Sequence, residues 1–137
     1  MVTELIAVGT EILLGNIVNT NSAYLSEKCA ELGLAVYYQS VVGDNPDRMK
    51  RVIKTALDRS DVIILTGGLG PTEDDLTKEI TAEVMGFPLV EDLHTKELME
   101  DYLREYEKNN PQRRITRNNY KQTMVPEGSM VLDNHNG

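Results

Sequence analysis

The 137-residue chain carries 22 acidic and 14 basic residues, which gives a net charge of −8 and a pI near 4.7. An acidic surface repels phosphate backbones, which argues against a general nucleic-acid binder. The length predicts one domain with its own core, and a single cysteine, Cys29, excludes an internal disulfide. No apolar run has the length of a membrane span and no signal peptide opens the chain. We therefore expect a cytoplasmic protein with no membrane partner.

Short apolar segments and helical patterns alternate along the chain. The predicted strands are residues 5–8, 36–42, 61–66 and 130–132. Apolar residues recur with helical spacing in four segments, which are 21–32, 46–57, 76–84 and 99–106. The strand over 61–66 is apolar on both faces, which is typical of a central parallel strand. The pattern predicts an α/β fold, a three-layer α/β/α sandwich with a mostly parallel sheet and right-handed crossovers.

Asparagine, proline and glycine mark the ends of the predicted helices. Asn45 and Pro46 fit the N-cap and first residue of a helix, and Asn21 is a natural N-cap for the helix before it. Gly33 and Gly86 follow helical segments and predict their C-terminal ends. Cys29 lies midway along the first long helix, where we expect a core position.

Three predicted strands end in polar loops that contain glycine: residues 9–11, 43–45 and 66–77. Parallel strands place such loops at one edge of the sheet, where ligands of open α/β sheets bind. In the third loop, Gly67, Gly68 and Gly70 let the backbone approach a ligand and offer N–H groups to phosphate. The loop is neither a P-loop nor a dinucleotide fingerprint.

Acidic side chains follow these glycines. Asp74 and Asp75 place negative charge where an anion would bind, and a divalent cation between carboxylate and phosphate would resolve the conflict. A structural alternative stays open, in which the glycines only form a turn and Asp74 or Asp75 caps the next helix. Asp44 is either a turn residue or, because it follows a strand at the same edge, part of the site.

Other polar residues are weaker candidates. Lys78 is interpreted as a helix-surface lysine rather than a phosphate partner. The basic stretch from Arg113 to Lys121 is either a solvated loop or a source of cations for a substrate phosphate. His94 and His135 have no partner at zinc-like spacing, which argues against a structural zinc site.

Four segments, read together, resemble a known family. They are AVGTEILLGNIVNTN at 7–21, VVGDN at 41–45, LTGGLGPTEDDLT at 65–77 and NNYKQTMVPEG at 118–128. They are similar, in the same order, to the N-terminal domain of the CinA (competence/damage-inducible) family, a domain of the type found in molybdenum-cofactor biosynthesis proteins. The family's last motif has proline where this sequence has His135. We expect residues 1–137 to be one such domain, truncated at its C-terminal end and impaired if the lost residues complete the pocket.

The resemblance implies hydrolysis of ADP-ribose or a related nucleoside diphosphate-sugar with a divalent metal ion such as Mg, Mn or Co. As a hypothesis, Asp44 and Asp75 would hold the metal or position the attacking water, with Asp74 as a further metal ligand. The residues expected to contact the phosphate-bearing substrate are Gly9, Thr10, Glu11, Asn21, Thr66, Gly67, Gly68, Gly70, Asn119, Lys121 and Pro126. Molybdenum-cofactor relatives bind molybdopterin, so the alternative is a non-catalytic molybdopterin- or nucleotide-binding or oligomerisation module. Domains of this kind often self-associate, so we expect a homo-oligomer.

Overall fold

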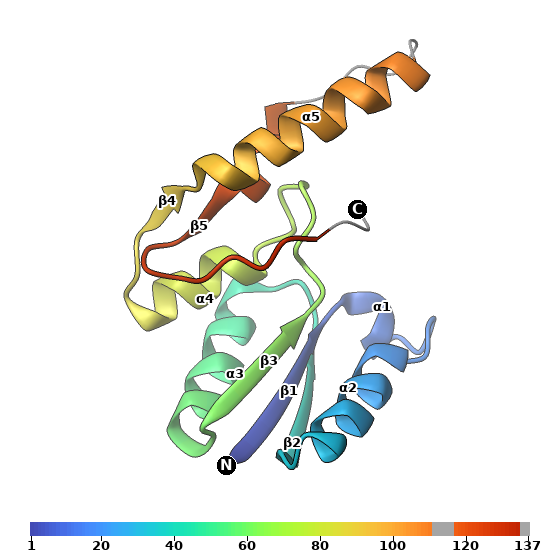
Figure 1. The fold of residues 1–137 in the computed structure, drawn as a ribbon. Coiled ribbons are helices and arrows are strands. Elements are labelled where there is room, and N and C mark those ends of the chain that lie inside the picture. Colours follow the sequence, from blue (N-terminus) through green and yellow to red (C-terminus); the bar gives the residue numbers. More distant parts are fainter. Residues whose placement is uncertain (111–116, 135–137) are drawn as a thin grey trace.

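The computed structural model describes residues 1–110 and 117–134 (Figure 1). Its main sheet has three parallel strands in the order β2-β1-β3, which are β1 (Val2–Val8), β2 (Ala35–Val42) and β3 (Val62–Thr66). A short helix, α1 (Thr10–Leu13), follows β1. Helix α2 (Thr20–Glu31) covers one face of the sheet, and α3 (Pro46–Arg59) covers the other (Figure 1). The predicted α/β/α sandwich with a parallel sheet is confirmed.

β1 is the central strand, and the prediction that residues 61–66 form the central strand is wrong. Leu5 is 1% exposed and pairs with Gln39 of β2 on one side and Ile64 of β3 on the other. β3 pairs only with β1 in the described part of the chain, and its five residues are half-buried. The connection through α3 crosses over β1 and leaves β3 at the edge, so an apolar sequence alone does not fix strand order.

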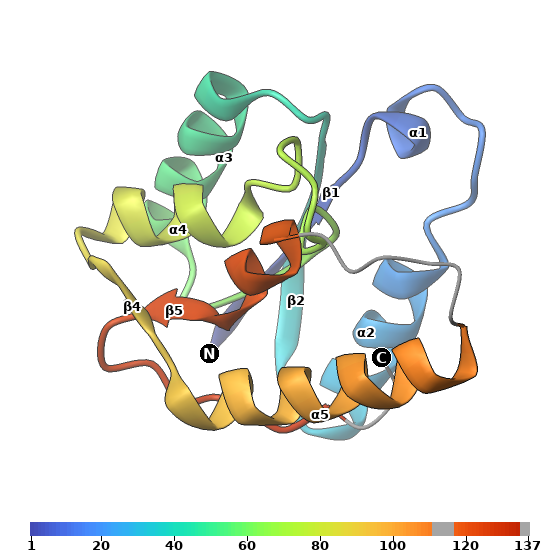
Figure 2. The same cartoon turned by 90° about the horizontal axis from the view of Figure 1, so that it is seen from above.

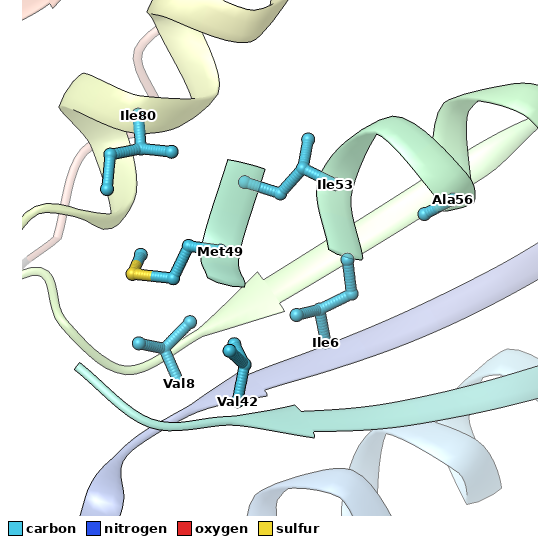
Figure 3. Packing of buried hydrophobic residues seen from close by; sticks show 7 residues of the cluster. All are labelled: Ile6, Val8, Val42, Met49, Ile53, Ala56 and Ile80. Carbon is cyan, nitrogen blue, oxygen red and sulfur yellow. The ribbon is translucent and has the colours of Figure 1, made fainter. Parts of the chain in front are cut away.

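The main core lies between the sheet and α3. Met49, Ile53 and Ala56 form one stripe of α3 and are at most 2% exposed. They pack with apolar side chains from β1, β2 and α4 (Thr77–Met85), namely Ile6, Val8, Val42 and Ile80 (Figure 3). As predicted, Pro46 opens α3, and the Asn45 side chain accepts a hydrogen bond from the Arg48 N–H at 3.0 Å.

A second, smaller part of the fold lies beyond the carboxyl ends of the main strands (Figure 1). β4 (Leu89–Glu91) and β5 (Met124–Pro126) pair antiparallel as a two-stranded ribbon. Helix α5 (Leu93–Asn109) and the 3₁₀ helix η1 (Arg117–Thr123) complete it. Seen from above, η1 lies next to the loop that follows β3 (Figure 2). Within residues 1–110 and 117–134, no helix is long and apolar enough to cross a membrane.

Two local predictions are wrong, each for a physical reason. Residues 130–132 form no strand, because the chain turns after β5 and leaves Met130 and Leu132 86% and 80% exposed. The turn contains Gly128 at a φ of +76°, a conformation that favours glycine. Asn19, not Asn21, caps α2, since its side chain accepts from the Ser22 N–H at 3.1 Å. The predicted core position of Cys29 is confirmed at 3% exposure.

Candidate functional site

The loops after β1, β2 and β3 meet at one edge of the sheet, as the sequence predicts. The last paired residues are Val8 with Val42 and Ala7 with Thr66, so the three strands end side by side. The Gly9 N–H donates to the Val42 carbonyl at 2.9 Å, which joins the first two loops where they leave the sheet. These loops form the candidate site.

Asp44 connects two of the loops. Its carboxylate accepts from the Thr10 N–H at 3.1 Å and from the Thr10 hydroxyl at 2.8 Å. In return, the Asp44 N–H donates to the same hydroxyl oxygen at 3.1 Å. Asp44 is exposed, so a ligand can still reach its carboxylate. The side chain does more than close its own turn, because it fixes the position of the neighbouring loop.

At two positions of the third loop, the backbone conformation and the close contacts require glycine. Gly67 has a φ of +85°, and a Cβ there would lie 2.0 Å from the Val8 carbonyl oxygen. Gly68 has a φ of +62°, and a Cβ there would lie 2.3 Å from the Thr77 hydroxyl oxygen. The loop therefore packs its bare backbone against β1 and the start of α4.

Thr77, the first residue of α4, fixes this loop through two hydrogen bonds to its backbone. Its side chain is 2% exposed, and its hydroxyl donates to the Gly67 carbonyl at 2.8 Å. Its N–H donates to the Gly68 carbonyl at 3.1 Å. In the described residues, the N–H groups of Gly67, Gly68 and Leu69 have no acceptor. The carbonyls of Gly67 and Gly68 therefore accept from Thr77, while three successive backbone N–H groups stay available. Successive backbone N–H groups of this kind can bind an anion.

Asp75 folds back onto the loop and does not cap α4. Its carboxylate accepts from the Thr72 N–H at 3.0 Å and from the Thr72 hydroxyl at 2.5 Å. The N-cap position of α4 is Leu76, which has no side-chain cap, so the capping alternative is excluded for Asp75. The hydrogen bond from the Thr72 hydroxyl is the main reason that the pKa of Asp75 lies below its ordinary 3.8, and the Gly70 N–H and Lys121 lower it further. Asp75 is therefore a carboxylate at neutral pH.

Side chains from η1 clasp the same loop. The Lys121 ammonium donates to the carbonyl of Thr72 at 2.8 Å and to that of Asp75. Gln122 donates to the Leu69 carbonyl at 3.3 Å. Lys121 was expected to contact substrate, and here its ammonium binds loop carbonyls. Sequence reasoning assigned no role to Thr72, Thr77 or Gln122, although Thr72 and Thr77 lie within LTGGLGPTEDDLT, one of the segments that carry the family resemblance.

The interpretation of Lys78 as a surface lysine is wrong. Its side chain is 20% exposed, and its ammonium donates to the Lys121 carbonyl at 2.6 Å. Burial lowers the pKa of Lys78, and the Glu79 carboxylate at 4.0 Å opposes that shift. Lys78, on α4, therefore holds the backbone of Lys121 in place and does not face bulk water.

The remaining predicted residues occupy different places. The Glu11 carboxylate lies so close to Gly9 that a Cβ on Gly9 would be 2.6 Å from it. Thr66 ends β3, and Asp74 is exposed on the third loop. Three residues lie on other elements: Asn21 is exposed on α2, Asn119 is half-buried in η1, and Pro126 pairs with Leu89 in the ribbon. Arg113 and His135 lie outside the described residues.

A divalent cation fits the chemistry of the carboxylates at this edge. Among the described residues, no group of three or more His, Cys, Asp or Glu side chains could hold a metal ion. Mg²⁺, however, is commonly bound by one or two carboxylates and takes its other ligands from phosphate and water. Asp44 and Asp75 are ligands of that kind, on the loops that follow β2 and β3, the two strands that flank β1.

These features define an α/β domain with a glycine-rich loop at the carboxyl edge of a parallel sheet. The model of the family described as "Probable molybdopterin binding domain" matches residues 4–132. A solved structure of CinA from Thermoplasma acidophilum is similar with a TM-score of 0.78 and 34% identity, over 99% of this chain and 76% of that one. The chain therefore belongs to the molybdopterin-binding domain family and, within it, to the CinA proteins.

Other relatives agree. A Thermoanaerobacter protein (strain X514) described as competence-damage inducible is 52% identical over 134 residues, which are 98% of this chain and 31% of that protein. A CinA-like protein of Trichormus variabilis is 47% identical over 137 residues, 100% of this chain and 32% of that protein. The molybdopterin biosynthesis enzyme MoaB of Thermus thermophilus shares the fold with a TM-score of 0.57 and 27% identity, over 60% of this chain and 53% of that one. This chain thus spans about a third of the length of these two curated relatives.

Proposed function

We propose that this domain is a CinA-type nucleotide pyrophosphatase that hydrolyses ADP-ribose or a related nucleoside diphosphate-sugar with a divalent metal ion. One observation carries the proposal. The N–H groups of Gly67, Gly68 and Leu69 have no acceptor in the described part of the chain, and the carboxylates of Asp44 and Asp75 lie at the same sheet edge. Donors for phosphate beside ligands for a hard cation suit the cleavage of a phosphoanhydride.

In this proposal the third loop binds the diphosphate. The free N–H groups donate to its oxygens, and Thr77 keeps them aimed because it binds the carbonyls of Gly67 and Gly68. Donors fixed before the substrate arrives stabilise developing charge without reorganisation. Glu11, exposed on α1, would line the neighbouring part of the pocket.

Asp44 and Asp75 would hold the cation, which would neutralise charge on the leaving phosphate. The lowered pKa of Asp75 makes it a weak proton acceptor at neutral pH. Asp75 therefore acts as a ligand or orients the attacking water, and does not serve as general base. Attack of water on one phosphorus breaks its bond to the bridging oxygen and releases AMP and ribose 5-phosphate.

The test is to incubate the chain with ADP-ribose and Mg²⁺, Mn²⁺ or Co²⁺ in turn and to measure AMP. We expect Asp75→Asn to abolish AMP release while its melting temperature stays nearly unchanged, because the amide oxygen can still accept from Thr72. Asp58→Asn, exposed on α3, is the control and keeps full activity. The proposal fails if the unsubstituted chain releases no AMP with any of the three metals, or if Asp75→Asn is as active as the unsubstituted chain.

A binding module without turnover is the second candidate, and the description of the matching family favours it. The loop donors would then hold the phosphate of a molybdopterin or nucleotide. Thermal shifts with ADP-ribose and with pterins, followed by product detection, separate the two functions. Binding of a pterin without AMP release from ADP-ribose would support the module.

The proposal includes a homo-oligomer. Large apolar side chains are exposed on α2, directly after it and on β2, namely Tyr24 at 60%, Leu32 at 76% and Tyr37 at 70%. A second copy packed on them would remove that surface from water. Light scattering coupled to size exclusion measures the mass directly.

A further inference from the structure

A second polar centre lies on the α3 face of the sheet. Glu4 of β1 is fully buried, and Arg59 binds its carboxylate through Nε at 2.9 Å and Nη2 at 2.7 Å. The hydroxyls of Ser40 and Ser60 donate to the same carboxylate at 3.0 Å and 3.2 Å. The hydrogen bond from Arg59 is the main reason that the pKa of Glu4 lies below its ordinary value. The carboxylate is fully satisfied, so it is a structural anchor for Arg59.

Arg59 is held in place but keeps donors to spare. Its guanidinium carbon lies 3.9 Å from the centre of the Tyr38 ring, in addition to its two bonds to Glu4. A guanidinium has five N–H donors, so three remain, including both on Nη1. The side chain is 37% exposed, which leaves these donors within reach of a ligand. A fixed guanidinium loses little entropy when it binds an anion.

Arg59 and a second arginine line one hollow. Its lining is Ser40, Arg51, Val52, Thr55 and Arg59, and its volume is about 170 Å³. One water needs only roughly 10–15 Å³ of such space, so a phosphate or carboxylate group fits. Arg59 ends α3, about 20 Å along the 14-residue helix from its first turn beside Asp44, and none of the residues that line the hollow belongs to the three site loops, so this hollow is distinct from the glycine-rich loop.

Arg51 adds to the hollow a positive charge that takes no part in the ion pair between Arg59 and Glu4. It is exposed on α3, and no described residue pairs with its guanidinium. Arg51 and Arg59 both line the hollow, and of these two only Arg59 is bound to the Glu4 carboxylate, so the hollow carries net positive charge on a chain of net charge −8. Arg59 alone neutralises Glu4, and the structural role therefore does not account for Arg51.

We propose that this hollow is a second anion site, which binds a phosphate or carboxylate group between Arg51 and Arg59. Guanidinium forks match the oxygens of both groups and make charge-assisted hydrogen bonds with them. Val52 adds an apolar wall, and the hydroxyl of Ser40 lies beside the fork. The site requires neither a metal ion nor the proposed hydrolysis.

The experiment is a titration of the 137-residue chain with inorganic phosphate and, separately, with acetate, at constant ionic strength in chloride with EDTA. Residue-resolved NMR follows the backbone amides and the Arg Nε signals. We expect saturable changes at residue 40 and along residues 51–59. Arg51→Gln should weaken binding about tenfold, the loss of roughly one charge-assisted hydrogen bond. Lys54→Gln removes the same charge from the same helix outside the hollow and should bind as the unsubstituted chain does.

Saturation by phosphate alone would support a phosphate-bearing ligand, and saturation by both anions would support a general oxyanion site. The proposal is overturned if neither anion gives saturable changes around the hollow, or if Arg51→Gln and Lys54→Gln weaken binding equally. Arg59 is left unchanged, because its removal would leave the buried Glu4 carboxylate without a cationic partner. Changes at residues 67–72 report on the glycine-rich loop, so either site can fail independently of the other.

Discussion

The part built on the main sheet and the part built on the ribbon are held together in different ways. In the sheet part, Leu5 and Ile6 are 1% exposed and Ala7 is fully buried. In the ribbon part, α5 buries only Leu103, at 9% exposure, and leaves Tyr102 56% exposed. Buried apolar area is the main source of stability, so the sheet part carries most of it.

The candidate site draws on both parts. The sheet part supplies all three loops, and the ribbon part clasps the third loop with Lys121 and Gln122. The ribbon part therefore matters more for the shape of the loop than for folding. The following predictions test that division, beginning with the largest expected effect.

Met49→Ala should destabilise the protein by about 2–5 kcal/mol, because it leaves a cavity in the close-packed core under α3. Leu103→Ala, in α5, should cost less than half as much, since Leu103 lies outside the main core cluster and α5 buries no other side chain. Urea unfolding followed by circular dichroism gives both values. Equal losses would show that the two parts share one core.

The sequence predicts the sheet part well because its signals are local and repeated. Met49, Ile53 and Ala56 recur with helical spacing, and Asn45 with Pro46 marks a helix start without any tertiary information. The error at residues 61–66 has a clear cause, since an apolar strand reports burial but not which strands lie beside it. The exposed residues 130–132 show the same limit.

The sequence predicts which residues meet at the site better than what they do there. Asp44 and Asp75 do lie on loops at the same edge of the sheet, as the strand pattern and the glycine positions indicate, although β1 lies between β2 and β3. Their partners, Thr10 and Thr72, depend on loop conformation that no periodicity encodes. The contact of Lys121 with the loop joins residues 46 and 49 positions apart, which only the tertiary fold brings together.

Thr77→Val should cost about 0.5–1.5 kcal/mol, because it removes the hydrogen bond from the buried Thr77 hydroxyl to the Gly67 carbonyl. It should also weaken ADP-ribose binding, since the loop donors lose their support. Thr81→Val is the control one turn later, where the hydroxyl binds a carbonyl of its own helix. The same unfolding and binding measurements apply. If both substitutions have equal effects, Thr77 does not shape the loop.

Lys121→Met should change the free energy of unfolding by less than about 1 kcal/mol, as expected for partly exposed hydrogen bonds. Hydrogen exchange at the amides of residues 67–76 should nevertheless become faster, because two loop carbonyls lose their donor. Lys108→Met, exposed on α5, is the matched control and should leave exchange unchanged. Unchanged exchange in Lys121→Met would contradict the clasp.

The smallest expected effect is the loss of the stability that Asp75 contributes to the third loop when the pH is lowered. The pKa of Asp75 is lowered in the folded state, so this carboxylate adds stability above its unfolded pKa of about 3.8 and loses it as pH falls through the folded value. The difference in melting temperature between the unsubstituted chain and Asp75→Asn should therefore be small near neutral pH and shrink further below about pH 4. Thermal unfolding at a series of pH values measures it. A difference that grows as pH falls would show that the pKa of Asp75 is raised.

The position of β3 at the edge of the described sheet makes aggregation in solution depend on pH. Val62–Thr66 reads VIILT, which has no charge and no proline, and it lies at an edge of the described sheet with half-buried side chains. Such a segment is a template for edge-to-edge pairing between molecules and for aggregation. The net charge of −8 keeps molecules apart at neutral pH. That repulsion vanishes near the pI of 4.7, where we expect aggregation to be fastest. The substitution Ile64→Lys should slow aggregation, because it places a charge in this strand.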